Sequence, residues 1–248
     1  ITQYHRLYKM CGIFGFYLNR QISENEIYEA KKNLNLLSHR GPDFSNYFLD
    51  KENGIFLGHT RLSIIDLSNK NNQPFIKNNK KLAYNGEIYN YKELTNKYLD
   101  KDIKFITKGD TEVLFEILSL NDFNKLSLID GMFAFAFLNK KNLYLGRDIY
   151  GEKPLYFYQN KSGIFFASEQ KPIINYCKLR KTFNIDANNE FINFGYNFKN
   201  KFYDISEVKA GNILHINNGK IIDDKNFDKI PSIKNKNNFR NFKEFDIN

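Results

Sequence analysis

The sequence predicts an α+β domain in which two packed β-sheets are flanked by helices. Many short apolar runs bounded by turn residues are typical of strands, and only a few segments show helical spacing. The strands come in blocks joined by hairpin signals, without regular strand–helix–strand alternation, which favours a layered α+β fold. The run 132–138 is apolar at every position, so we expect both faces of that strand to be covered.

Nine segments are expected to form strands. Seven of them span residues 11–18, 55–65, 82–89, 132–138, 143–149, 155–158 and 164–167. Two more, at 212–217 and 220–222, are separated by Asn218 and Gly219, a pair of residues that favours a tight hairpin turn. The sequence therefore predicts at least one hairpin near its carboxyl end.

Four helices are expected between these strands. Ser23 and Glu26 form a capping-box pattern, which predicts a helix from about residue 24 to about residue 37. The other three begin near Asn90, Asp110 and Asp186.

Composition limits the function classes. A chain of 248 residues with 42% hydrophobic content can bury a core and forms one large domain or two small ones. Lys and Arg outnumber Asp and Glu by 37 to 28, but these charges are interspersed, so we expect no nucleic-acid partner. No apolar run approaches the roughly 20 residues of a membrane helix, and we expect no membrane partner either.

The two cysteines, Cys11 and Cys177, are too few for a disulfide framework, and no secretory signal precedes them. We therefore expect a reducing, cytoplasmic location. No Cys/His spacing indicates a metal site. Cys177 lies in an apolar stretch, where a buried, inert thiol is the usual outcome.

Cys11 directly follows Met10. An initiator Met is removed when a small residue follows, and a start at Met10 would leave Cys11 with both a thiol and a free α-amine. Such an amine has a pKa of about 7.7–8.0, so it can accept the thiol proton near neutral pH, directly or through a water. Residues 1–10 are then an upstream extension or a propeptide. The alternative is a cysteine packed at the start of a core strand, and these residues alone leave both interpretations open.

Seven short sequence strings, the first of which contains Cys11, follow one another along the chain. They are MCGIFG (10–15), HRGPD (39–43), GHTRLSIID (58–66), NGEIYN (85–90), GDTE (109–112), DGMFAFA (130–136) and GRD (146–148). In this order they resemble the class II glutamine amidotransferases with an N-terminal nucleophile, and within that family the glutamine-hydrolysing asparagine synthetases. The similarity runs from Met10 to about Ile222.

The resemblance implies a four-layer αββα sandwich of the N-terminal-nucleophile hydrolase type over residues 11–225. It implies that Cys11 attacks L-glutamine and forms a thioester, with the Asn85 side chain and the Gly86 N–H stabilising the oxyanion. No cofactor is expected for this step. Asn85 and Gly86 are also expected to form a tight turn after the strand that starts at residue 82, since a turn presents an N–H outward.

By the same resemblance, Arg61 binds the α-carboxylate of glutamine, for which its planar guanidinium suits a bidentate contact. Leu62 and Ile65 offer backbone groups, and Glu87 and Asp110 accept hydrogen bonds from the α-ammonium. The alternative role of Asp110 is a helix N-cap.

A Cys–His dyad with His39 or His59 is the rival mechanism for Cys11. In the resembling family these histidines lie in segments that shape the pocket, and the α-amine serves as the base.

Residues 226–248 are interpreted as a linker and the start of a C-terminal synthetase domain. The Ser-Gly-Gly-x-Asp-Ser phosphate loop of that domain does not occur by Asn248, so ATP and magnesium are expected only in the missing part. The full-length protein is then expected to supply ammonia for ATP-dependent asparagine synthesis from aspartate, and a homodimer is left open. The alternatives are another class II amidotransferase that acts on sugars or envelope polysaccharides, and a non-catalytic fold relative.

Overall fold

The computed structural model describes residues 10–63, 69–99, 103–180, 185–195 and 203–227. The expectations about residues 1–9, Ile65 and residues 228–248 lie outside this part of the chain. None of the described helices is long and apolar enough to cross a membrane.

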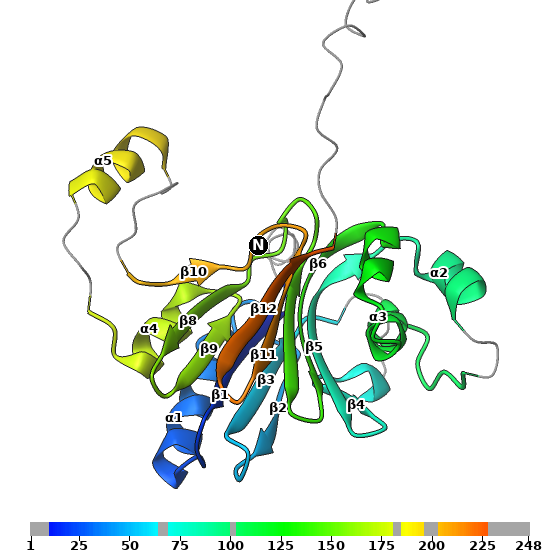
Figure 1. Ribbon diagram of the computed structural model, residues 1–248, viewed down its shortest axis with the longest axis horizontal. Coiled ribbons are helices and arrows are strands. Elements are labelled where there is room, and N and C mark those ends of the chain that lie inside the picture. Colours follow the sequence, from blue (N-terminus) through cyan, green and yellow to red (C-terminus); the bar gives the residue numbers. More distant parts are fainter. Residues whose placement is uncertain (1–9, 64–68, 100–102, 181–184, 196–202, 228–248) are drawn as a thin grey trace, which may run out of the picture.

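Twelve strands form two antiparallel six-stranded sheets among the described residues (Figure 1). The first sheet has the order β10-β8-β9-β1-β3-β2, with β1 Gly12–Leu18, β2 Phe44–Asp50, β3 Ile55–Arg61, β8 Tyr156–Asn160, β9 Gly163–Ala167 and β10 Ser206–Glu207. The second has the order β12-β11-β7-β6-β5-β4, with β4 Phe75–Lys77, β5 Lys80–Ile88, β6 Gly131–Asn139, β7 Asn142–Arg147, β11 Asn212–Asn217 and β12 Lys220–Asn226.

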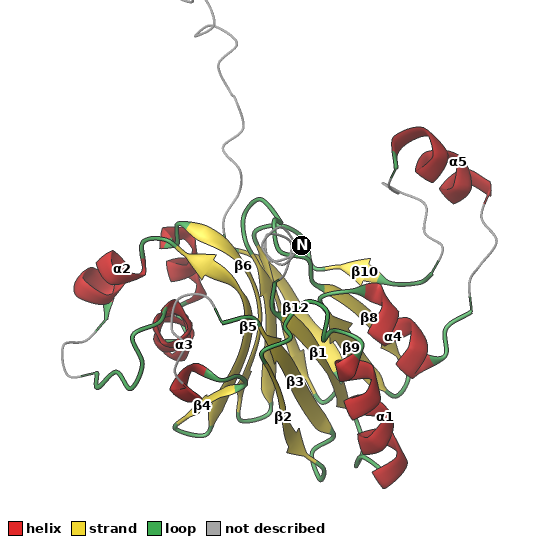
Figure 2. Cartoon of the chain, turned by 180° about the vertical axis from the view of Figure 1, so that it is seen from behind, coloured by secondary structure: helices red, strands yellow, loops and turns green. Residues whose placement is uncertain are grey.

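The helices of the described residues are α1 Glu24–Asn35, α2 Tyr91–Tyr98, α3 Asp110–Ser119, α4 Gln170–Cys177 and α5 Ile185–Phe194, with short 3-10 turns at Asn69–Asn71 and Phe123–Leu128. Helices α1 and α4 cover the outer face of one sheet and α2 and α3 that of the other, while α5 stands away from both (Figure 2). Side chains of α1 and α4 share a hydrophobic core with the first sheet, and those of α2 and α3 share one with the second. A third core lies between the sheets. The predicted αββα layering is therefore confirmed.

The apolar strand β6 lies in the interior of the second sheet, between β5 and β7. Its side chains alternate between two cores, as the two-residue period of a strand requires. Phe133, Phe135 and Phe137 pack under the helices, whereas Ala134 and Ala136 face the other sheet. The small alanines let the two sheets approach closely, and the prediction that both faces of this strand are covered is confirmed.

Local signals fixed several boundaries. The Ser23–Glu26 capping box is present at the start of α1, which ends at Asn35, earlier than expected. Asn218 and Gly219 turn between β11 and β12 with φ values of 46° and 71°, as a tight hairpin requires. Asn90 is the N-cap residue of α2, but its side chain makes no cap hydrogen bond; it bridges Leu128 O and Asp130 N instead.

Strands β2, β4 and β10 and helix α4 were not predicted from the sequence. Strand β2 is half exposed and has little apolar content on its open side, while α4 has only eight residues, too few to establish a helical period.

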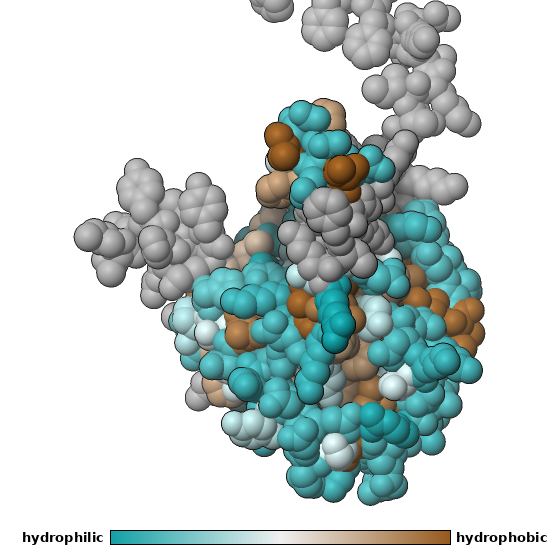
Figure 3. Space-filling view, turned by 90° about the vertical axis from the view of Figure 1, so that its left-hand side faces the viewer, coloured by the Kyte–Doolittle hydropathy of each residue, from teal (hydrophilic) through white to brown (hydrophobic). Residues whose placement is uncertain are grey.

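In the side view of Figure 3 the surface is mainly hydrophilic, with hydrophobic side chains gathered on helix α5. Those exposed side chains are Ile185, Phe191, Ile192 and Phe194.

Candidate active site

Strand alternation brings the predicted site residues into one space between the two sheets. On β1 and β3, the odd-numbered Ile13 and Leu57 pack in the inter-sheet core, so Cys11 and Arg61 are directed to the same side. On β5, Ala83 packs there too. Asn85 and Glu87, two and four residues further, therefore also point between the sheets, and the site lies at the end where β1 begins and β3 ends.

Cys11 immediately precedes β1, and its thiol is held by the backbone that follows β3. The Leu62 N–H donates to Sγ over 3.3 Å, and Sγ lies 3.7 Å from Leu62 O. The Nε of Arg40 donates to the carbonyl oxygen of Cys11 over 3.0 Å. The guanidinium of Arg40 is itself fixed by Glu169 at 3.1 Å. Both the thiol and the main chain of Cys11 are thus held in place.

Burial raises the pKa of the Cys11 thiol above its ordinary value of about 9.0. The Leu62 hydrogen bond and the positive charges of Arg61 and Arg40 act in the opposite direction but do not cancel it. The resting thiol is therefore protonated at neutral pH, and a base must remove its proton before it can attack.

Asn85 and Gly86 lie within strand β5, where they pair with Ala134 and Phe133 of β6. The predicted tight turn at these two residues is therefore wrong. The pairing of β5 with β6 continues to Ile88 opposite Gly131, and the hydrogen bonds of this sheet override the turn preference of an Asn-Gly pair.

The Asn85 side chain is 1% exposed, and its amide Nδ2 has no hydrogen-bond partner. Buried amide groups are almost always paired, because an unpaired one costs about 1–3 kcal/mol. A donor kept in this state is ready to bind an acceptor that enters the site.

The Gly86 N–H points the same way as its neighbours two residues on each side, because strand N–H groups alternate in direction. Tyr84 N donates to Gln73 Oε1 at 2.6 Å, and Ile88 N donates to Asp110 Oδ2 at 3.0 Å. The Gly86 N–H lies between these two, on the side of β5 that faces away from β6. Only Gly fits here, since a Cβ would collide with the backbone oxygen of Met132.

Asp110 is the first residue of α3, but the N-cap position is taken by Gly109. The alternative role of Asp110 as an N-cap is therefore wrong. Its Oδ2 accepts hydrogen bonds from the Tyr84 hydroxyl at 2.8 Å and from Ile88 N at 3.0 Å. Burial raises the pKa of Asp110, and these two hydrogen bonds oppose the rise. The carboxylate is thus aimed at β5 and lies close enough to Cys11 to influence the pKa of its thiol.

Arg61 is 5% exposed, and its Nη1 donates to Asn72 Oδ1 at 2.6 Å. Glu87 is partly buried on β5, opposite Met132 of β6. Arg61 and Asp110 both lie close enough to Cys11 to act on the pKa of its thiol, and Glu87 lies on the same side of β5 as Asn85. Such a set can bind both charged groups of an amino acid.

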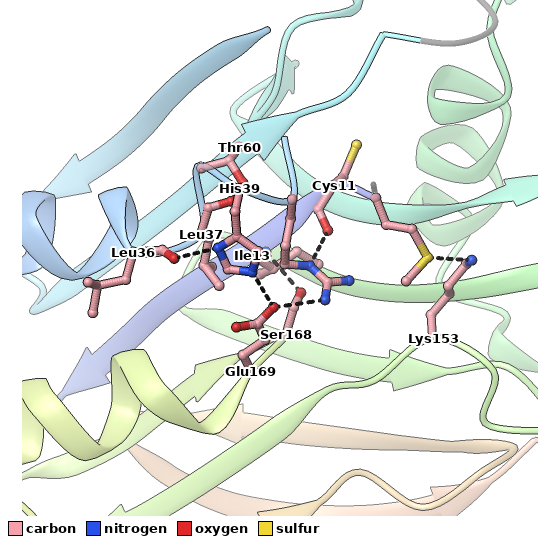
Figure 4. Close-up of polar contacts among 11 residues, drawn as sticks. Cys11, Ile13, Leu36, Leu37, His39, Thr60, Lys153, Ser168 and Glu169 are labelled. Carbon is pink, nitrogen blue, oxygen red and sulfur yellow. Dashed lines mark hydrogen bonds and ion pairs between the residues drawn. The ribbon is translucent and has the colours of Figure 1, made fainter. Parts of the chain in front are cut away.

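Neither histidine of the proposed Cys–His dyad contacts the thiol. His59 is fully buried, its Nε2 lies 2.9 Å from Tyr84 O, and burial lowers its pKa to about 4. His39 is exposed and bonds to Leu36 O and Glu169 (Figure 4). His59 connects the two sheets as a neutral donor, and His39 braces the Arg40–Glu169 pair.

Cys177 is the last residue of α4, and burial raises the pKa of its thiol to about 12. It packs against the outer core of the first sheet, whereas Cys11 is directed between the two sheets. The residue is partly buried instead of fully buried, and its raised pKa favours the protonated thiol at neutral pH. Within the described residues, no group of three or more His, Cys, Asp and Glu side chains is placed to hold a metal ion.

The sequence profile of the glutamine amidotransferase domain matches residues 10–227. This chain belongs to that family. Three curated relatives are similar to it in sequence. A putative glutamine-hydrolysing asparagine synthetase 2 of Methanocaldococcus jannaschii is 33% identical over 76% of this chain, asparagine synthetase 1 of Bacillus subtilis 38% over 66%, and asparagine synthetase B of Escherichia coli 38% over 70%. The chain spans 40%, 27% and 32% of their respective lengths.

Among solved structures, the glutamine phosphoribosylpyrophosphate amidotransferase of B. subtilis aligns with a TM-score of 0.65. The match covers 88% of this chain and 49% of that one at 21% identity, and it supports the fold. The N-terminal-nucleophile type of αββα sandwich, expected from the motifs, is thereby confirmed for this amidotransferase domain.

Some contacts at the site had no signal in the sequence. Arg40 lies in the HRGPD string, but nothing in that string indicates that its side chain binds the main chain of Cys11, 29 positions earlier. Tyr84 precedes Asn85 and could only be expected to be core. Lys153, whose ammonium contacts Met10, lies 143 positions from it.

Proposed function

We propose that this domain hydrolyses the side-chain amide of L-glutamine to glutamate and ammonia, with Cys11 as the first residue of the mature chain. The unpaired, buried Nδ2 of Asn85 is the observation that carries the proposal. An unpaired buried donor destabilises the free protein, but it can bind the oxyanion of a reaction intermediate, which supplies the missing acceptor. The Gly86 N–H, next to it on the open side of β5, is the second donor.

The proposed reaction starts when the α-amine of Cys11 takes the thiol proton. The Sγ then attacks the amide carbon, and the electron pair of the C=O bond moves to oxygen, which Asn85 and Gly86 stabilise. As this pair returns, the C–N bond breaks, and the α-ammonium gives its proton to the leaving nitrogen, which departs as ammonia. Water, deprotonated by the same amine, attacks the thioester, and glutamate leaves as Sγ recovers a proton.

Free glutamine is distinguished from glutamate and from peptide-bound glutamine by its two backbone charges. We propose that Arg61 binds the α-carboxylate and that Asp110 and Glu87 accept hydrogen bonds from the α-ammonium. Charge-assisted hydrogen bonds of this kind contribute about 1.5–3 kcal/mol each. The backbone of Leu62, which holds the thiol in the free protein, then becomes available to the substrate when Sγ moves to attack.

We further propose that this domain is part of a longer protein in which the ammonia serves ATP-dependent asparagine synthesis from aspartate. The names and greater lengths of the three relatives support this proposal. ATP and magnesium would be bound by the synthetase part, and the reducing cytoplasm suits a catalytic thiol. An acceptor among sugars or envelope polysaccharides is the less favoured alternative, because all three relatives are asparagine synthetases by name.

The test is glutamine turnover by the chain expressed from Met10, since all three hydrophobic cores consist of residues after it. Glutamate and ammonia should form in equal amounts, and Cys11→Ala should abolish both. Cys177→Ala is the matched control and should retain activity, because this thiol lies in a different core. Activity that survives Cys11→Ala would contradict the proposal.

A further inference from the structure

A lysine ammonium lies beside the residue that precedes the nucleophile. Lys153 is 7% exposed, and its Nζ donates to the thioether sulfur of Met10 at 2.8 Å (Figure 4). A thioether is a weak acceptor. Lys153 forms no ion pair with any carboxylate in the described part of the chain. A buried ammonium in such surroundings is costly, which suggests that its charge has a use.

The loop that carries Lys153 is held firmly. The Lys153 N–H donates to Asp148 Oδ2 at 3.1 Å, and its carbonyl oxygen accepts from Arg147 Nε at 2.8 Å. Asp148 is fully buried and also accepts from the N–H groups of Phe133, Tyr150 and Glu152. The position of the lysine near Met10 is therefore set by the backbone and does not depend on its side-chain contact.

Several charged or titratable groups face the start of β1 from the surrounding elements. They are Arg40, Arg61 and Lys153, the acids Glu87, Asp110, Asp148 and Glu152, and the buried phenol of Tyr84. Glu169 pairs with Arg40, the carboxylate of Asp148 is occupied by backbone N–H groups, and that of Asp110 binds Tyr84 and Ile88. Glu152 and Glu87 attract the charge of Lys153 from a distance, but neither forms an ion pair with it in the described part of the chain.

We propose that Lys153 is a positioning residue for the catalytic base: once Met10 is removed, its ammonium faces the new α-amine of Cys11 and keeps that amine neutral and able to accept a proton. The proposal rests on the proposed function and on removal of Met10. A nearby positive charge disfavours a second one. For a unit charge roughly 6 Å away, Coulomb's law lowers an amine pKa by about 0.5 unit at the dielectric constant of water, about 80, and by about 2 units at an effective value near 20, so a shift of roughly one unit is expected at a partly buried site.

The test compares Lys153→Met, which removes the charge but keeps much of the length, with Lys153→Arg, which keeps the charge. The control is Lys209→Met, at a side chain that is 75% exposed. Each chain is expressed from Met10 and treated with 6-diazo-5-oxo-L-norleucine, an electrophilic glutamine analogue, from about pH 5.5 to about pH 9. Intact mass gives the rate of Cys11 labelling, and thermal melts check folding.

For Lys153→Met, the acidic limb of the labelling profile should move up by about one pH unit, so that labelling near pH 6.5 is roughly tenfold slower and the rates converge at high pH. Lys153→Arg and Lys209→Met should follow the parent chain. An unchanged profile, or a loss equal at every pH, would overturn the proposal. If the parent chain takes no label at any pH, the proposed function fails and this inference with it. Lys153→Gln serves as the second neutral variant if Lys153→Met does not fold.

Discussion

Asn85→Ala separates the catalytic role of a buried amide from a structural one. Asn85 is 1% exposed, and its Nδ2 is buried without a hydrogen-bond partner. Removing this amide nitrogen therefore breaks no hydrogen bond of the free protein. The desolvation cost of about 1–3 kcal/mol that Ala relieves offsets the packing lost with three side-chain atoms. The free energy of unfolding should therefore change by no more than about 1 kcal/mol.

Glutamine turnover should respond very differently. With one of two oxyanion donors removed, kcat should fall by roughly 100- to 1000-fold, equivalent to about 2.7–4 kcal/mol, while KM changes little. The assays are coupled ammonia release for kcat and KM, and urea unfolding for stability.

Asn212→Ala is the matched control, because Asn212 is also a buried strand asparagine but has its amide paired. Its Nδ2 donates to Asp224 at 2.6 Å, and its Oδ1 accepts from Asn226 at 2.8 Å. This variant should lose about 1–3 kcal/mol of stability and keep its kinetics. If Asn85→Ala turns over glutamine at the parental rate, or loses as much stability as Asn212→Ala, the assignment of Asn85 as an oxyanion donor is refuted.

Three further predictions concern residues around the site. Gly86→Ala should force β5 away from the Met132 oxygen, and urea unfolding should show a loss of about 1–3 kcal/mol together with lost turnover; parental stability would contradict the close approach. The pKa of His59 falls from 6.5 in the unfolded chain to about 4 on burial, so stability present above about pH 6.5 should fall by about 3 kcal/mol as the pH drops to about 4. His59→Gln should flatten that part of the urea profile, and an equally steep profile would exclude this group as the cause. Tyr84→Phe removes a donor to Asp110 and should raise KM for glutamine about tenfold, or about 1.4 kcal/mol, while an unchanged KM would separate Asp110 from substrate binding.

The sequence predicted most of the layers because hydrophobic periodicity reports which faces are buried. The apolar run of β6 and the turn at Asn218 and Gly219 are strong signals of this kind, and both have the expected structure. Local hydrogen bonding explains the success at Ser23, where the capping box depends only on residues three positions apart. The half-exposed β2 and the short α4 were not predicted, because their stability comes from pairing and packing with distant segments.

At the site, the motifs named residues that the structure brings together around Cys11 and β5, but they did not predict their local geometry. Asn85 and Gly86 lie in a strand instead of a turn, because pairing with β6 outweighs the preference of the two residues. Asp110 faces β5 instead of capping α3, since Tyr84 and the Ile88 N–H supply its partners. Such partners are 22 to 26 positions away along the chain, and contacts at this distance produce no periodic pattern in the sequence.

The central claim is that Cys11 acts as an N-terminal nucleophile in a glutamine-binding site. The most direct test is intact mass spectrometry of the chain expressed from Met10, before and after exposure to 6-diazo-5-oxo-L-norleucine. The account predicts a mass that lacks Met10 and gains one adduct, mapped to Cys11 and abolished by Cys11→Ala. A folded chain that has lost Met10 and takes no adduct, or takes it at another residue, would contradict the claim.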